Sequence, residues 1–400
     1  MTNKKAQLGI IFLTVFIDLI GFGIVIPVLP LYAKDFHANE MTIGLLLGTY
    51  SLMQFIFSPI LGKISDRVGR RPVLLVSLLA TSAGLGVMGF AHSLVWLFVG
   101  RIIPGIAVGN ISTAQAYIAD ITAPEERTRA MGLIGAAFGL GFTVGPGIGG
   151  LLSQYSTAAP FFFAAALALF NAILAYVRLP ESLSHEHRAT AQERAPLSQV
   201  FKHGWHLPAL MGTYFISIAS FAIMTTIFAL FTNERFGFGK RENGYLFMFI
   251  GFIGIVIQGG MLRQLVKRVS EKSLAVTGVF LLLVGLALLP LAHSLAVLLI
   301  VASVIGVGNS LVTPTLNGLA SRSAERSWQG RVTGLMQSSG SLARCVGSFA
   351  AGELLSLDAD KLGHAFSYYG RTPCWVAAGV MVFALILTLR LPAKPITAES

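Results

Sequence analysis

The chain has 400 residues, of which 54% are hydrophobic and only 12% are charged. A soluble protein of this length carries roughly 25% charged residues, so the composition excludes an ordinary soluble domain. The formal net charge of +11 would suit a nucleic-acid partner, but the basic residues lie in short segments between apolar runs, which is the pattern of a membrane protein that binds no nucleic acid.

Twelve apolar segments approach the ~20 residues that a helix needs to span a bilayer. They predict an all-α membrane protein with helices near residues 8–32, 43–62, 73–92, 94–118, 130–153, 159–179, 207–232, 243–262, 273–292, 295–319, 332–356 and 372–391. A polar stretch follows the sixth segment. We therefore predict one six-helix bundle over residues 1–179, a cytoplasmic linker over 180–206 and a second six-helix bundle over 207–400.

The distribution of Lys and Arg predicts the orientation of the chain. With the N-terminus inside, 21 of the 29 basic residues fall in cytoplasmic segments and 6 in outer segments, while Arg101 and Arg344 lie within spans. Basic residues concentrate on the cytoplasmic side of membrane proteins. We therefore predict a multi-pass protein of the cell (inner) membrane with both termini in the cytoplasm.

The two halves repeat at a shift of about 200 residues. Residues 129–133 (R-A-M-G-L) are similar to residues 331–335 (R-V-T-G-L), and Gly145 corresponds to Gly347. Two bundles of like orientation are typical of secondary transporters. The repeat is incomplete, because Gln264 stands in the second half where Asp66 stands in the first. We expect the second half to contribute less to gating.

Residues 62–72 carry five charges and two glycines between two apolar runs, and they predict a tight loop at the membrane surface. A carboxylate in such a loop can accept hydrogen bonds from arginines or from a helix N-terminus. A basic loop with a chance carboxylate is the alternative. The candidate gating residues are Gly62, Asp66, Arg67, Gly69, Arg70 and Arg71.

Two charged residues lie inside predicted spans of the first half. Asp18 lies about ten residues into its helix, roughly 15 Å deep, and a carboxylate at that depth is functional by default. Arg101 lies on an antiparallel helix and needs a partner. We predict that the two share one electrostatic site that a proton at Asp18 weakens. A static pair that braces the bundle is the alternative.

Polar and aromatic residues on other spans are candidates for lining a central substrate cavity, although phenylalanines at helical spacing more often pack in a core. They are Tyr50, Gln54, Asn110, Phe142, Tyr214, Phe221, Gln258, Asn309, Gln337 and Arg344. An aromatic cavity suits amphipathic organic substrates. Arg344 could meet an anionic or chelated group or cap a broken helix, and the sequence leaves both open. The fifth span is rich in small residues that permit close helix packing, namely Gly141, Gly145, Pro146, Gly149 and Gly150.

In combination, these motifs resemble the major facilitator superfamily. The order G-x-x-x-D-R-x-G-R-R at 62–71 resembles its loop between helices 2 and 3, and G-x-x-x-G-P-x-x-G-G at 141–150 resembles the antiporter signature of its drug–proton exporters. Residues 18–30 are similar to the first helix of tetracycline–proton antiporters and multidrug exporters, and residues 120–127 and 179–182 add shorter matches.

The resemblance implies two six-helix bundles that export small organic compounds in exchange for protons by alternating access, with a monomer as the functional form. A carrier of the same fold for another solute, such as a sugar or lipid, coupled to protons or sodium, is the first alternative, and a membrane receptor is the second. The sequence has no phosphate loop, no His-x-x-x-His pair and no nucleophile with a base. We therefore expect no enzyme activity, no cofactor and no metal site.

Overall fold

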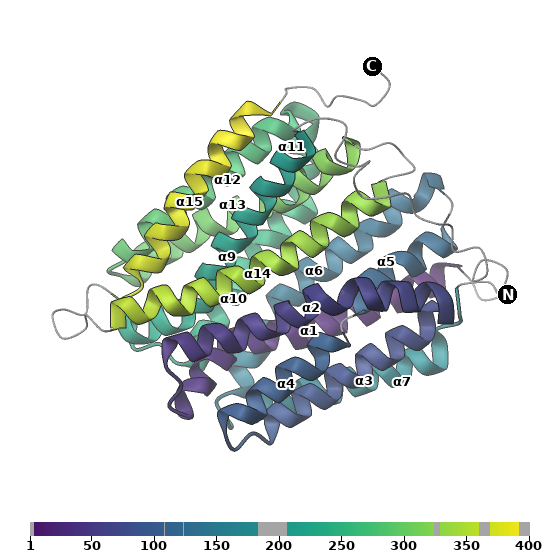
Figure 1. Ribbon diagram of the computed structural model, residues 1–400, viewed down its shortest axis with the longest axis horizontal. Coiled ribbons are helices and arrows are strands. Elements are labelled where there is room, and N and C mark those ends of the chain that lie inside the picture. Colours follow the sequence, from purple (N-terminus) through teal and green to yellow (C-terminus); the bar gives the residue numbers. More distant parts are fainter. Residues whose placement is uncertain are drawn as a thin grey trace. The chain divides into compact units, whose positions relative to one another are not determined.

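The computed structural model describes residues 4–107, 109–122, 124–182, 206–323, 329–359 and 369–391. Within these ranges, all regular structure is helical (Figure 1). The first half contains α1 (Lys4–Asp35), α2 (Glu40–Val68), α3 (Arg70–Gly89), α4 (Leu94–Ile106), α5 (Asn110–Ile121), α6 (Pro124–Leu152) and α7 (Ala159–Arg178). The second half contains α9 (His206–Phe236), α10 (Lys240–Ile255), the π-helix η2 (Val256–Met261), α11 (Leu262–Arg268), α12 (Glu271–Leu288), the short 3-10 helix η3 (Leu289–Leu291), α13 (Leu295–Arg322), α14 (Gln329–Ala359) and α15 (Arg371–Arg390).

Eleven helical segments of the described chain are long and apolar enough to cross a membrane. They correspond to eleven of the twelve predicted spans. The remaining predicted span, 332–356, lies within α14, which has 31 residues but a lower mean hydropathy because several Ser and Gly residues accompany Arg344 and Glu353. Most of the predicted linker, residues 183–205, lies outside the described residues.

The helices group into two compact units. Unit 1 holds the described residues of Met1–Ala38, Thr49–Glu193 and Gly239–Gly251, and unit 2 holds those of Asn39–Gly48, Arg194–Phe238 and Phe252–Ser400. Each unit thus takes a helical segment from the other half of the sequence: most of α10 belongs to unit 1, and the start of α2 belongs to unit 2. The division into bundles at 1–179 and 207–400 stays a prediction.

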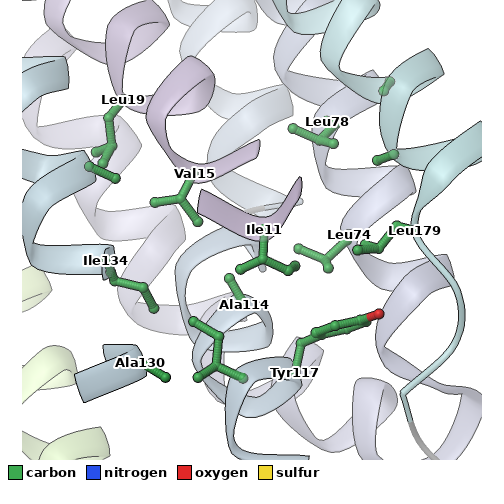
Figure 2. Packing of buried hydrophobic residues seen from close by; sticks show 14 residues of the cluster. Ile11, Val15, Leu19, Leu74, Leu78, Ala114, Tyr117, Ala130, Ile134 and Leu179 are labelled. Carbon is green, nitrogen blue, oxygen red and sulfur yellow. The ribbon is translucent and has the colours of Figure 1, made fainter. Parts of the chain in front are cut away.

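The core of unit 1 follows from helical periodicity. Ile11, Val15 and Leu19 recur every four residues on one face of α1 and are at most 3% exposed. Figure 2 shows this face with side chains from α3, α5, α6 and the end of α7 around it. Tyr117 of α5 is buried in the same cluster, and its hydroxyl donates to the Pro180 carbonyl at 2.8 Å. The cluster therefore buries an aromatic ring without leaving its polar atom unpaired.

The predicted fourth span departs from a single continuous helix. The predicted span 94–118 corresponds to the apolar segment Leu94–Ile121, within which α4 ends at Ile106 and α5 begins at Asn110. Pro104 lies inside α4 and lacks the N–H of a regular helix. At the break, the Gly109 amide donates to the Ser77 hydroxyl of α3 at 3.1 Å. The same amide also donates to the Ala107 carbonyl at 2.7 Å, so both α3 and the preceding turn hold the start of α5.

Candidate functional site

Asp18 and Arg101 line the same cavity in unit 1. The cavity is open to solvent, and its free space, with the solvent at its mouth included, is about 380 Å³. Its wall is formed by four helices, and the lining residues are Asp18, Gly21, Phe22, Val25, Tyr50, Thr81, Leu85, Met88, Gly100, Arg101 and Pro104. The two charged residues that the sequence assigned to one site thus lie around one space.

Arg101 is 7% exposed, and its guanidinium carbon lies 4.6 Å from the centroid of the Tyr50 ring. A cation over an aromatic face is attracted by the negative face of the ring. The Nε atom of Arg101 is buried and has no hydrogen-bond partner among the described residues. Asp18 is half-buried. The contact observed for the guanidinium is thus with Tyr50, a partner that the sequence analysis placed only in the substrate cavity.

Aromatic rings extend from this cavity. The ring of Phe22 lies 5.7 Å from that of Tyr50 and 5.6 Å from that of Phe142, measured between centroids. Phe142 in turn lies 6.2 Å from Phe138. The predicted cavity residues Tyr50 and Phe142, 92 positions apart in sequence, are therefore joined through Phe22. Gln54 lies one turn after Tyr50 on α2 and is half-buried.

Three other predicted cavity residues come together in unit 2. Arg344 of α14 donates from Nη2 to the Ser341 hydroxyl at 3.1 Å, and that hydroxyl donates to the Gln337 carbonyl at 3.1 Å. A Cβ atom added at Gly340 would lie 3.2 Å from the Tyr214 hydroxyl of α9 and 3.6 Å from Nη1 of Arg344. Tyr214 of α9 thus lies beside the turn of α14 that carries Gln337 and Arg344.

The remaining predicted cavity residues are placed separately. Phe221 of α9 and Asn309 of α13 are half-buried, and Gln258 is exposed within η2. A π-helix inside a longer helix is rare and often marks a functional segment. Asn110 is the first residue of α5, and its side chain lies outside the described part of the structure.

The predicted gating loop is mostly helix. α2 continues to Val68 and α3 begins at Arg70, so the prediction of a loop over 62–72 is wrong, and the turn is confined to Gly69. Gly69 has a φ of 113°, a value that residues other than glycine rarely adopt. Gly62 lies inside α2, and a Cβ added there would meet nothing within 4 Å, so it provides no close approach. Arg67 is exposed on the last turn of α2.

Arg70 is the centre of a charged cluster at this turn. It is 9% exposed, and its guanidinium donates to Asp66 at 2.6 Å, to Asp120 of α5 at 3.1 Å and to the Ser65 hydroxyl at 3.2 Å. The expected bond between Asp66 and an arginine is therefore present. Together with Glu181, these charged residues form the Arg70 cluster, which consists of Asp66, Arg70, Asp120 and Glu181.

Glu181, three residues after the end of α7, completes the cluster. Its two carboxylate oxygens accept from the backbone amides of Arg70, at 2.8 Å, and Arg71, at 3.2 Å, and so cap the N-terminus of α3. Arg71 donates to the Tyr176 carbonyl of α7, and its guanidinium lies 5.3 Å from the Tyr176 ring. Sequence reasoning noticed residues 120 and 181 only as parts of family motifs, because nothing local pairs them with Arg70.

The glycine motif of α6 packs against α1. A Cβ atom at Gly145 would lie 2.7 Å from the Ile20 carbonyl, and one at Gly149 would lie 2.7 Å from the Ile24 carbonyl. Gly141 faces Leu19 at 2.5 Å in the same way. Gly150 faces the start of α10 within unit 1, where its Cβ would lie 2.9 Å from Gly244. Pro146 lies among these glycines but does not break the helix, since α6 is continuous from Pro124 to Leu152.

Comparison with known proteins gives consistent results along the chain. The family model described as Major Facilitator Superfamily matches residues 11–348. Multidrug resistance protein 2 of Bacillus subtilis (strain 168) is 30% identical over 367 residues, covering 89% of this chain and 90% of the relative. The class C tetracycline resistance protein of Escherichia coli is 34% identical over 346 residues, covering 84% of this chain and 86% of the relative. The crystal structure of the human organic anion transporter MFSD10 matches with a TM-score of 0.72 and 23% identity, covering 97% of this chain and 100% of that one.

Proposed function

Since the chain belongs to the major facilitator superfamily, we propose that it is a proton-coupled antiporter that exports small amphipathic organic compounds. The family consists of membrane transporters that carry small organic substrates, so the chain is a multi-pass transporter and not an enzyme. The names of the multidrug and tetracycline resistance relatives support drug-like substrates of the tetracycline type for this chain.

The observation that carries the proposal is the shared cavity of Asp18 and Arg101. A carboxylate within an apolar membrane-spanning helix is the natural carrier of a transported proton. When Asp18 is ionised, its charge favours a cationic or strongly polar substrate in the cavity. When a proton neutralises it, that attraction is lost and the substrate leaves. Proton and substrate then occupy the site alternately, which is the requirement for exchange.

The Arg70 cluster is the proposed latch of the transport cycle. It links the end of α2, the start of α3, the end of α5 and the segment that follows α7 through one buried arginine. Alternating access requires one end of the bundle to close firmly while the substrate site opens at the other. We propose a monomer in the cell membrane with both termini in the cytoplasm, which places this latch at the cytoplasmic end.

The test is proton release when tetracycline binds to purified protein in detergent, measured with a pH indicator at low buffer concentration. The wild type is expected to release protons on binding. Asp18→Asn is expected to bind without proton release, because the neutral amide has no proton to exchange. Thr81→Ala is the matched control, since it alters the cavity wall without removing a charge.

Binding without proton release by the wild type would contradict the exchange mechanism. It would leave a carrier of the same fold that works by facilitated or sodium-coupled transport. Release that persists in Asp18→Asn would retain the exchange and remove Asp18 as the coupling group.

A further inference from the structure

Arg101 has more hydrogen-bonding capacity than its surroundings use. A guanidinium carries five N–H donors in a planar fork. The observed contact of this group is with the Tyr50 ring, and Nε has no hydrogen-bond partner among the described residues although the side chain is 7% exposed. A buried donor without a partner is unfavourable, and a ligand that brings an acceptor to it removes this penalty. The cavity therefore favours a ligand that brings an anionic group to Arg101.

We propose that the Arg101 end of the cavity binds the carboxylate of an aromatic organic anion, as a second class of substrate. A carboxylate matches the arginine fork with two parallel hydrogen bonds. The guanidinium carbon lies 4.6 Å from the centroid of the Tyr50 ring, and such a cation–π contact uses none of the N–H donors that a carboxylate needs. Arginine retains its charge in proteins, so the site is not switched off by its own titration.

The rest of the cavity fits the apolar part of such a ligand. Phe22, Val25, Leu85, Met88 and Pro104 supply apolar wall, and the rings of Phe22 and Phe142 continue it away from Tyr50. Buried apolar wall with a few convergent polar groups is the usual composition of a small-molecule site. A flat aromatic acid would place its head on Arg101 and its ring beside Phe22.

Asp18 gives this class of substrate a coupling opposite to that of the drugs. Ionised Asp18 repels a second negative charge in the same cavity, and neutral Asp18 does not. An anion should therefore bind with uptake of a proton, whereas exchange of a neutral or cationic drug releases one. This second step rests on the proposed role of Asp18, but the binding of the anion at Arg101 does not.

The experiment compares 2-naphthoate with 2-naphthamide, which has nearly the same shape and no charge. Each is titrated calorimetrically into purified protein in two buffers of different ionisation enthalpy, which gives both the affinity and the number of protons exchanged. The wild type should prefer naphthoate by about 10-fold to 100-fold, the range for hydrogen bonds to charged groups, and should take up protons. Arg101→Gln should lose the preference. Asp18→Asn should keep the preference and lose the proton uptake.

Two outcomes would overturn the proposal: equal affinity of the wild type for both compounds, or a preference that survives in Arg101→Gln. If Arg101→Gln does not fold, Tyr50→Leu decides, because loss of the supporting ring should lower the affinity for naphthoate more than that for naphthamide. A wild type that prefers naphthoate but shows no proton release with tetracycline would separate this inference from the exporter proposal. Tetracycline-driven release without any naphthoate preference would leave the exporter and remove the anion site.

Discussion

The two halves of the chain stabilise equivalent helix starts in opposite ways. In the first half, α3 begins with Arg70, which pairs with Asp120 near the end of α5. In the second half, α12 begins with Glu271, which pairs at 2.9 Å with Arg322 at the end of α13. The positions correspond at a shift of about 200 residues, so the sign of each charge is reversed between the halves.

The difference follows from the helix dipole. The N-terminus of a helix carries partial positive charge, so Glu271 is favourable at the start of α12 and Arg70 is unfavourable at the start of α3. α12 also has a local cap, since the Ser270 hydroxyl accepts from the Ser273 amide at 3.1 Å. α3 has no side-chain cap of its own. It depends on Glu181, 111 positions away, and on two aspartates that neutralise Arg70. A buried network of distant residues therefore stabilises the start of α3, whereas residues at the helix start itself stabilise α12.

Exposure gives the same contrast. The side chain of Arg70 is 10% exposed, and that of Arg322 is 59% exposed. Breaking a buried ion pair leaves an uncompensated charge and is strongly destabilising, whereas an exposed pair contributes little. A latch needs the first kind of contact, because only a buried network changes its free energy steeply when it opens.

Arg70→Ala should have the largest effect, a loss of about 3 kcal/mol, because Asp66 and Asp120 then remain close together without their cation. The measurement is the apparent melting temperature in detergent. Arg67→Ala, one turn earlier on α2 and exposed, is the matched control and should change little. Equal effects of the two substitutions would mean that the Arg70 cluster contributes no more than an exposed charge.

For the glycines of α6 and α14 we expect the two halves to agree, with a similar loss of stability on substitution in each half. A Cβ at Gly145 would lie 2.7 Å from the Ile20 carbonyl, and one at Gly347 would lie closer still to the Ala219 carbonyl. Gly145→Ala and Gly347→Ala should each lower stability by about 2 kcal/mol through overpacking against backbone.

The controls for the glycine prediction are Gly132→Ala and Gly334→Ala. They are the corresponding open positions, with nothing within 4 Å of an added Cβ. Alanine favours helix over glycine by up to about 1 kcal/mol, so these two substitutions should leave the melting temperature unchanged or raise it. A loss at the open positions as large as at the tight ones would show that glycine matters there for reasons other than packing.

The same contrast explains what could be predicted from sequence. Span lengths and the motifs at 62–71 and 141–150 led to the all-α major facilitator fold, and that prediction is confirmed. The depth of Asp18 and Arg101 in antiparallel helices predicted one shared electrostatic site, because depth along a helix follows from residue number. Both residues line one cavity, and their electrostatic pairing stays a prediction. These features depend on local sequence alone.

What escaped prediction depends on tertiary neighbours. The Tyr50 ring beneath Arg101 and the Glu181 cap on α3 join residues 51 and 111 positions apart, and no spacing rule links them. The extent of the gating loop was overestimated because charged residues can continue a helix beyond the apolar core of a membrane. The hydrogen bond from the Gly109 amide to the Ser77 hydroxyl of α3 likewise joins residues 32 positions apart.

Glu181→Gln tests the long-range cap directly. It removes a charge from the positive end of α3 but keeps one acceptor oxygen, so the expected loss is about 1 kcal/mol. Arg178→Gln, exposed near the end of α7, is the control for altered charge in the same segment. The melting temperature should fall for Glu181→Gln alone, and the fall should shrink at high salt because the interaction is electrostatic. No change would mean that the two amides find equivalent acceptors without the carboxylate.

Glu271→Gln should have the smallest effect, about 0.5 kcal/mol or less, because Arg322 is exposed and the Ser270 cap remains. Double-mutant cycles make the comparison quantitative, since they isolate the energy between two side chains. The cycle of Asp120→Asn with Arg70→Gln should give a coupling several times that of Glu271→Gln with Arg322→Gln. Equal couplings would show that the two halves hold these helix starts with equal strength. They would then give no reason to assign the proposed latch to the Arg70 cluster.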